Sequence, residues 1–159
     1  MHSNKYIFIA IPIFFLEILT SQLVEDLEIY LLKIAGLCCF AFAVFLWLTA
    51  LHSFLKFGGK KKNKIYYFTE NLITRGIFSV IRHPQYLAFM FIGLGFLLIN
   101  LHYLVTILFV CNVIFFYLQT LEEDKFLSEK FGNEYKLYKK AVPSINIVKG
   151  IFRKSAPKY

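Results

Sequence analysis

The residues best suited to chemistry lie in the run Arg82-His83-Pro84-Gln85-Tyr86, directly before a long apolar segment. Charged side chains are costly inside a membrane helix, so a cationic cluster at the start of one points to a binding site at the lipid-water boundary. Pro84 suits the first position of a helix, where its missing N–H would have had no partner. We therefore predict a helix that begins at Pro84, with free N–H groups and a positive dipole end that favour an anionic group.

A second candidate group is the acidic pair Glu122 and Glu123, which follows the next apolar segment. With a rise of about 1.5 Å per residue, a helix over 84–101 travels about 27 Å and one over 103–123 returns about 31 Å. The two ends are then level, so the two carboxylates are expected beside His83. A ligand that carries both a carboxylate and an ammonium group could bridge these helix ends.

The segments that would position these groups are strongly apolar. The chain has 159 residues, of which 58% are hydrophobic and 18% are charged, which is too apolar for a soluble domain of this size. Runs of about 17 to 25 apolar residues can cross a membrane as helices, and such runs occur at 6–24, 29–55, 84–101 and 103–121. The predicted fold class is an all-α integral membrane protein, with four transmembrane helices as two hairpins plus a C-terminal cytoplasmic amphipathic helix.

The charge distribution predicts the topology of these helices. The net charge is +8, and most basic residues lie between the second and third apolar runs or after residue 121, whereas Glu25, Asp26 and Glu28 lie on the other side. Positive residues favour the cytoplasmic face, so both termini and the active site are expected there. The lysines within 60–64 are expected to bind anionic lipids, at about 1 kcal/mol each. The positive charge therefore requires no nucleic acid.

The chain is expected to form a single domain over 1–159. Its parts would be an N-terminal hairpin at 1–56, a cytoplasmic loop at 57–83, a second hairpin at 84–121 and a cytoplasmic tail at 122–159. The first apolar run lacks a small-residue cleavage site, so we expect a retained anchor rather than a signal peptide. A turn is predicted at Asn100-Leu101-His102.

The tail carries apolar residues at spacings of three and four, which places them on one face of a helix. We expect a break at Gly132-Asn133, and Val142-Pro143 should end the helix. The helix would lie on the membrane or fold back over the mouth of the second hairpin. The residues of its apolar face are Leu127, Phe131, Tyr135, Tyr138 and Val142.

Other titratable residues carry weaker signals. Glu17 lies at membrane depth, where a carboxylate is a functional candidate by default, but it belongs to no motif, and we expect it to pack against a hydroxyl or a lysine of a neighbouring helix. His52 and His102 would lie at opposite membrane faces, so a metal site shared with His83 is not expected. The cysteines lack metal-ligand spacing and are expected to be small core residues; they are Cys38, Cys39 and Cys111.

An ordered series of motifs resembles the isoprenylcysteine carboxyl methyltransferase family, which is related to the phospholipid methyltransferases. Each motif alone is weak, but the series is fairly specific. It covers roughly the last 90 residues, and the N-terminal hairpin matches only in being hydrophobic. The motifs are Leu72-Ile73-Thr74-Arg75-Gly76-Ile77-Phe78, Arg82-His83-Pro84-Gln85-Tyr86-Leu87, Glu122-Glu123, Phe131-Gly132-Asn133-Glu134-Tyr135-Lys136-Leu137-Tyr138 and Val142-Pro143.

The resemblance implies a multi-pass enzyme that uses S-adenosyl-L-methionine to methylate a lipophilic or lipid-modified acceptor reached from the bilayer. The sulfonium is already activated, so the protein mainly has to align the acceptor and exclude water, which can contribute about 7 to 11 kcal/mol. No catalytic side chain is therefore implied. The cofactor-binding residues would be Leu72, Ile73, Phe78, Arg82, His83, Pro84, Gln85, Tyr86, Glu122 and Glu123, and Gln119 would contact the substrate.

The chain departs from the pattern of the family at positions that concern the acceptor. Gln119 stands where enzymes that act on prenylcysteine often have an arginine, and Ala141 stands where a basic residue often precedes Val-Pro. Glu70 and Ala88 are further departures, which cofactor binding should survive. A carboxylate, an amine or a thiol therefore stays open as the methyl acceptor, and so does the oligomeric state.

Three alternatives stay open beside the prenylcysteine-type activity. The first is a phospholipid N-methyltransferase. The second is an NADPH reductase related to the sterol reductases, which usually have an acidic residue shortly after the His-Pro-x-Tyr core, where this chain has Ala88-Phe89. The third is a non-enzymatic membrane adaptor whose basic loop and tail recruit partners.

Overall fold

The computed structural model describes residues 4–24, 29–58 and 71–153, and every regular element in these ranges is helical. The predicted all-α class is therefore confirmed. The predictions about the lysines of 60–64, the acidic residues of 25–28 and Glu70 lie outside the described residues. Each of the four apolar runs contains one long helix, and these helices are α1 (Ile7–Leu23), α2 (Tyr30–Phe57), α3 (Pro84–Asn100) and α4 (Tyr103–Phe131).

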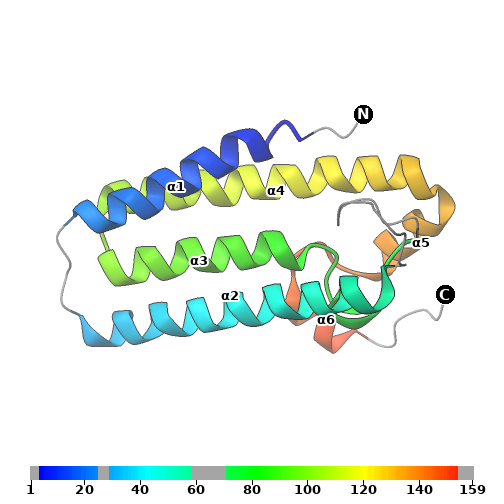
Figure 1. Cartoon of the computed structure of the whole chain (residues 1–159), viewed down its shortest axis with the longest axis horizontal. Helices are drawn as coiled ribbons and strands as arrows, with labels where there is room; N and C mark the ends of the chain where they lie inside the picture. Colours follow the sequence, from blue (N-terminus) through cyan, green and yellow to red (C-terminus); the bar gives the residue numbers. More distant parts are fainter. Residues whose placement is uncertain (1–3, 25–28, 59–70, 154–159) are drawn as a thin grey trace.

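The four long helices lie side by side along the long axis of the molecule (Figure 1). Three short elements gather toward one end of this bundle, where α3 begins. They are the 3-10 helix η1 (Gly76–Ser79), α5 (Asn133–Ala141) and α6 (Ile147–Phe152).

Of the two predicted hairpins, α3 and α4 pack together as expected, whereas α1 and α2 do not form a packed pair. α2 packs mainly on α3, α1 packs mainly on α4, and α3 and α4 join the two pairs. One physical reason is a close approach between α2 and α3, because a Cβ added to Gly36 would lie 2.8 Å from the carbonyl oxygen of Gly95. Glycines allow helix backbones to approach in this way. The predicted hairpin of α1 and α2 is thus replaced by pairing across the bundle.

Glu17 provides the polar link between α1 and α4. Its carboxylate is fully buried and accepts a hydrogen bond from the side-chain amide of Asn112 on α4. It also lies against α3, because a Cβ added to Gly93 would be 3.0 Å from its Oε1. The partner on the neighbouring helix is therefore an amide, and not the hydroxyl or lysine that the sequence suggested.

The boundaries of the helices follow local sequence signals. Pro84 occupies the first turn of α3, as predicted, and His83 is the N-cap residue. α4 continues beyond the apolar run to Phe131 and ends at Gly132, whose φ of +59° suits a residue without a Cβ. α5 ends at Ala141, directly before Val142-Pro143.

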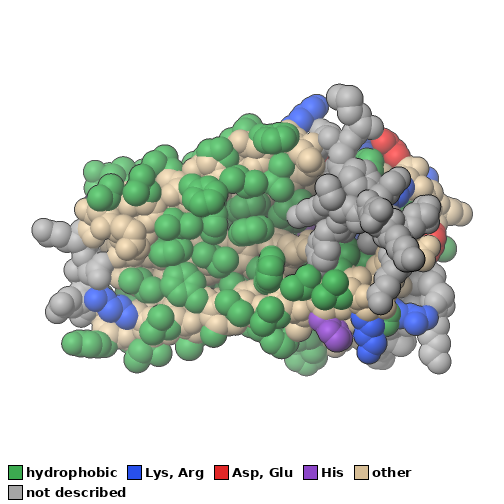
Figure 2. Space-filling view, viewed as in Figure 1, with side chains coloured by type: hydrophobic (Ala, Val, Ile, Leu, Met, Phe, Trp, Pro, Cys, Tyr) green, Lys and Arg blue, Asp and Glu red, His purple; other side chains and the backbone are tan. Residues whose placement is uncertain are grey.

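The outer surface of the bundle is largely apolar. α2 and α4 are long and apolar enough to cross a membrane, and α1 and α3 are shorter apolar helices of 17 residues each. Figure 2 shows hydrophobic side chains spread along this face of the bundle. Cys38 lies exposed on α2, so it is not the core residue that was predicted. These features agree with a membrane protein.

Candidate functional site

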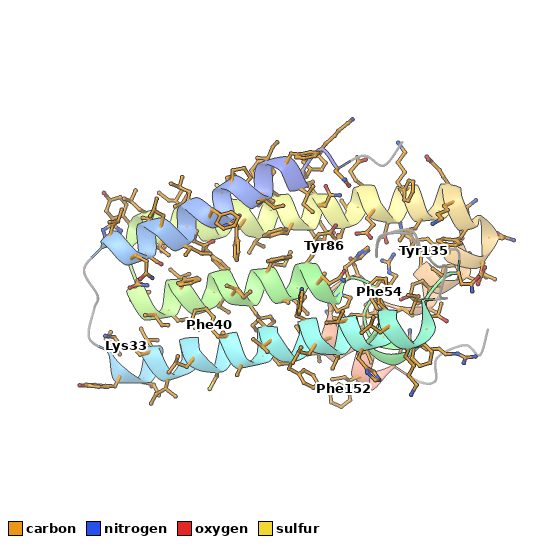
Figure 3. The ribbon with its side chains drawn as sticks, viewed as in Figure 1. Lys33, Phe40, Phe54, Tyr86, Tyr135 and Phe152 are labelled. Carbon is orange, nitrogen blue, oxygen red and sulfur yellow. The ribbon has the colours of Figure 1, made fainter. Side chains whose placement is uncertain are left out.

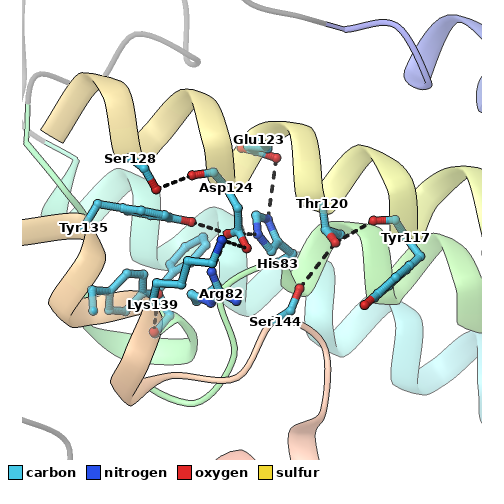
Figure 4. Close-up of polar contacts among 12 residues, drawn as sticks. Arg82, His83, Tyr117, Thr120, Glu123, Asp124, Ser128, Tyr135, Lys139 and Ser144 are labelled. Atoms are coloured by element: carbon cyan, nitrogen blue, oxygen red, sulfur yellow. Dashed lines mark hydrogen bonds and ion pairs between the residues drawn. The ribbon is translucent and has the colours of Figure 1, made fainter. Parts of the chain in front are cut away.

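The start of α3 and the distal part of α4 meet at the end of the bundle. The ring of His83 lies between two carboxylates of α4, because its Nε2 is 2.9 Å from Asp124 Oδ1 and its Nδ1 is 3.6 Å from Glu123 Oε2. Arg82 also donates a hydrogen bond to Asp124 (Figure 4). The two helix ends that were expected to lie level are therefore in direct contact.

Asp124 is the centre of this polar cluster. Its side chain is 1% exposed and pairs with Arg82 and His83. From α5, the Tyr135 hydroxyl donates to its Oδ1 at 2.5 Å, and Lys139 Nζ lies 3.3 Å from its Oδ2. A buried carboxylate is tolerated only when it is paired and hydrogen-bonded. Asp124 thus joins α4, α5 and the segment before α3.

The cluster shifts the ionisation of its members. Burial alone would lower the pKa of His83, but hydrogen bonds to Asp124 and Glu123 raise it above its ordinary value. Burial alone would raise the pKa of Asp124, but His83, Tyr135 and Arg82 hold it well below its usual range. Both ring nitrogens of His83 face carboxylates, so the geometry favours the imidazolium, which can donate from both.

The segment after α5 supports the backbone of the cluster. Arg82 N–H donates to the Pro143 carbonyl at 3.0 Å, and His83 N–H donates to the Ser144 carbonyl at 3.1 Å. The hydroxyl of Tyr138 donates to the Phe78 carbonyl at 2.6 Å. The backbone N–H groups of Arg82 and His83 are thus satisfied within the protein.

A pocket opens beside this cluster, with a cavity volume of about 90 Å³. Of the ten residues predicted to bind the cofactor, seven line it. Although they are distant in the sequence, they come together from the segment before η1, from η1 itself, from the start of α3 and from α4. They are Leu72, Ile73, Phe78, Arg82, His83, Gln85 and Glu123.

The structure does not bring the other predicted residues to the pocket lining. Pro84 is buried at the start of α3. The ring of Tyr86 packs 5.9 Å from that of His83 and 6.1 Å from that of Phe116, measured between centroids, and so belongs to the core. Glu122 is half-buried outside the lining.

Gln119, the predicted substrate contact, is fully buried away from the lining. Its Oε1 accepts a hydrogen bond of 3.1 Å from the N–H of Ile7, in the first turn of α1. The first N–H groups of a helix have no partner within that helix. The side chain of Gln119, on α4, therefore caps the N-terminus of α1.

Several lining residues escaped the sequence analysis. The structure adds Phe126, Phe131 and Tyr135 as aromatic walls, and it adds Asp124 behind them. A signal for Asp124 was present, because it lies three residues before Leu127 and so continues the apolar face of the tail by one turn. A carboxylate in line with a buried face requires a partner elsewhere in the fold.

The pocket offers complementary charges and flat apolar walls. Arg82 is a largely buried cation of the lining, and its guanidinium is paired with Asp124. Glu123 provides an acceptor on another wall. Phe78, Phe126 and Phe131 can pack against a planar ring. The lining therefore suits a ligand with an anionic group, a cationic group and an aromatic ring.

Comparison with known proteins places the chain in a family. The family model described as phospholipid methyltransferase matches residues 31–134, which is more than half of the chain. The chain therefore belongs to the phospholipid methyltransferase family. The relationship read from the motifs is confirmed at this level.

The chain is also similar to protein-S-isoprenylcysteine O-methyltransferase of Schizosaccharomyces pombe, with 33% identity over 93 residues. The aligned stretch covers 58% of this chain and 38% of that protein. The chain thus spans less than half the length of this curated relative. No solved structure matches the chain.

Proposed function

We propose that the chain is an S-adenosyl-L-methionine-dependent membrane methyltransferase that acts on a lipophilic acceptor, as isoprenylcysteine carboxyl O-methyltransferases do. The observation that carries this proposal is the pocket at the meeting point of α3 and α4, which combines Arg82, Glu123 and aromatic walls. Family membership supports methyl transfer and argues against the reductase and adaptor alternatives.

The lining residues fit the proposed methyl donor. S-adenosyl-L-methionine would supply a methyl group activated on a sulfonium, together with a carboxylate, an ammonium group and an adenine ring. The positive charge of Arg82 suits the carboxylate, and Glu123 suits the ammonium group. The rings of Phe126 and Phe131 suit the adenine. In this arrangement Asp124 touches no ligand and instead holds Arg82 and His83 in position.

The chain's own task in the reaction would be alignment and exclusion of water. When bound, S-adenosyl-L-methionine would supply the methyl group to an oxygen, a nitrogen or a sulfur of the acceptor. The α5 residues Tyr135 and Tyr138 wall the pocket. A carboxylate acceptor needs no base because it is ionised at neutral pH, whereas an ammonium acceptor must first lose a proton.

The proposal includes four membrane crossings, with both termini and the pocket on the cytoplasmic side and a C-terminal amphipathic helix. The hydrogen bond from Ile7 to Gln119 supports this topology, because it puts the start of α1 one turn from Glu123 on α4. α2 ends and α3 begins at the same end of the bundle (Figure 1). In α5, Tyr135 and Tyr138 are buried while Lys139 and Lys140 are exposed.

A phospholipid amine is the second candidate acceptor. Enzymes that act on prenylcysteine often have an arginine at the position where this chain has Gln119. The side-chain oxygen of Gln119 accepts a hydrogen bond from the backbone of α1. That residue offers no cation to a substrate carboxylate. The description of the matching family also names phospholipids. The two acceptors are therefore compared directly in the test.

The test measures cofactor binding and methyl transfer separately, on the purified full chain. Titration calorimetry in detergent should detect binding of S-adenosyl-L-methionine and S-adenosylhomocysteine. Vesicles that contain the chain should then transfer a tritiated methyl group to farnesylcysteine or to phosphatidylethanolamine. Absence of binding to both cofactors would overturn the proposal, whereas binding with transfer to one acceptor would assign the substrate.

A further inference from the structure

α6 presents an apolar face to the outside of the molecule. Val148 and Ile151 are each 62% exposed and Phe152 is 81% exposed. Spacings of three and four place these three side chains on one side of the helix. Figure 3 shows the Phe152 side chain directed away from the bundle. A short helix that is exposed to water would gain nothing from this arrangement.

The opposite side of α6 is held firmly against the bundle. A Cβ added to Gly150 would lie 2.2 Å from the carbonyl oxygen of Val80, so the two backbones are in close contact. Arg153 donates hydrogen bonds to the carbonyl of Ser79, at 2.5 Å, and to that of Ala141. Ile147 packs against the main hydrophobic core. α6 is therefore fixed with its apolar face outward.

The position of α6 along the bundle indicates what covers this face. Its contact partner Val80 lies four residues before Pro84, where α3 begins. Along the long axis, α6 lies near the level at which α3 begins and beside the bundle, not beyond its end (Figure 1). In the proposed membrane placement, the first turn of α3 lies at the boundary between lipid and water.

We propose that α6 is an interfacial anchor that inserts Val148, Ile151 and Phe152 into the lipid surface; this inference rests on the proposed membrane placement. The neighbouring cation Lys149 is exposed and suits anionic headgroups. A six-residue helix offers far less than the roughly 800 Å² per partner that a stable protein interface needs, so a second copy of the chain fits less well.

The test uses tryptophan fluorescence, because Trp47 is the single tryptophan of the chain. Trp47 lies half exposed on α2, within the proposed lipid-facing surface. The variant W47F/F152W would be reconstituted in vesicles of phosphatidylcholine and phosphatidylglycerol. We expect blue-shifted emission, strong quenching by lipids brominated near the headgroup, and weak quenching by aqueous iodide.

A matched variant, W47F/K136W, places the probe at an exposed position of α5 and should be quenched several-fold more strongly by iodide. Equal iodide quenching of the two variants, with native Trp47 protected, would overturn the anchor and leave the membrane placement intact. Accessible Trp47 would instead overturn the placement itself. The tryptophan of W47F/F152W could also be protected from iodide only at a high ratio of protein to lipid. Loss of this protection on dilution with lipid would show that a second copy of the chain covers the face, and it would also overturn the anchor.

Discussion

His83 Nε2 lies 2.9 Å from Asp124 Oδ1, although the two residues are 41 positions apart in the chain. This contact joins the start of α3 to the polar end of α4. It also connects to α5, because Tyr135 donates a hydrogen bond to the same carboxylate oxygen. The wall of the proposed cofactor pocket thus depends on a residue that need not touch the cofactor.

Replacing Asp124 with alanine should strongly destabilise the fold. The change leaves Arg82 and His83 as buried groups without their carboxylate, and breaking a buried ion pair costs about 3 to 5 kcal/mol. Thermal unfolding in detergent would measure the loss. Glu129→Ala is the matched control, because Glu129 is an exposed carboxylate on the same helix and should change stability by less than about 0.5 kcal/mol. Similar losses in both variants would contradict the central role of Asp124.

The stability of the protein should depend on the protonation of His83. Its pKa in the folded protein is raised above the ordinary value of 6.5, so the folded state holds this proton more tightly than the unfolded state. The resulting stabilisation is full below about pH 6.5 and is lost as the pH rises through the folded pKa. The melting temperature should therefore fall over that window, and His83→Gln should flatten this part of the profile. An unchanged profile in the variant would show that another group titrates.

Glu123 and Glu122 should differ in their effect on cofactor binding. Only Glu123 lines the pocket, so Glu123→Gln should weaken binding of S-adenosyl-L-methionine by about tenfold or more, the cost of losing a charged hydrogen bond. Glu122→Gln removes the same charge one residue away and should leave the affinity almost unchanged. Calorimetry on both variants would measure the difference. Equal weakening would indicate a general charge effect instead of a direct contact.

Glu17 should contribute to stability through its hydrogen bond to Asn112. Glu17→Ala would leave the buried Asn112 amide without this partner, at a cost of about 1 to 3 kcal/mol. Glu17→Gln has nearly the same shape and can still accept the amide hydrogen, so its loss should be smaller. Thermal unfolding of the two variants in one detergent gives the comparison. A larger loss for glutamine than for alanine would contradict the proposed pairing.

The sequence by itself determined the helices and most of their ends. Apolar periodicity, Pro84 at a first turn, Gly132 at a break and Pro143 after a last turn act within a few residues, so each could be predicted from its neighbours. The order of the motifs also identified seven of the residues that line the pocket. These are local properties of the chain.

Only the tertiary structure decided which helices pair and which polar groups meet. α1 pairs with α4 and not with α2, Gln119 caps α1, and Asp124 on α4 gathers partners from α5 and from the segment before α3. The physical reason is that apolar faces of similar hydrophobicity can pack in several ways. The choice among them depends on close backbone contacts and on the satisfaction of buried polar groups, which join residues far apart in the sequence.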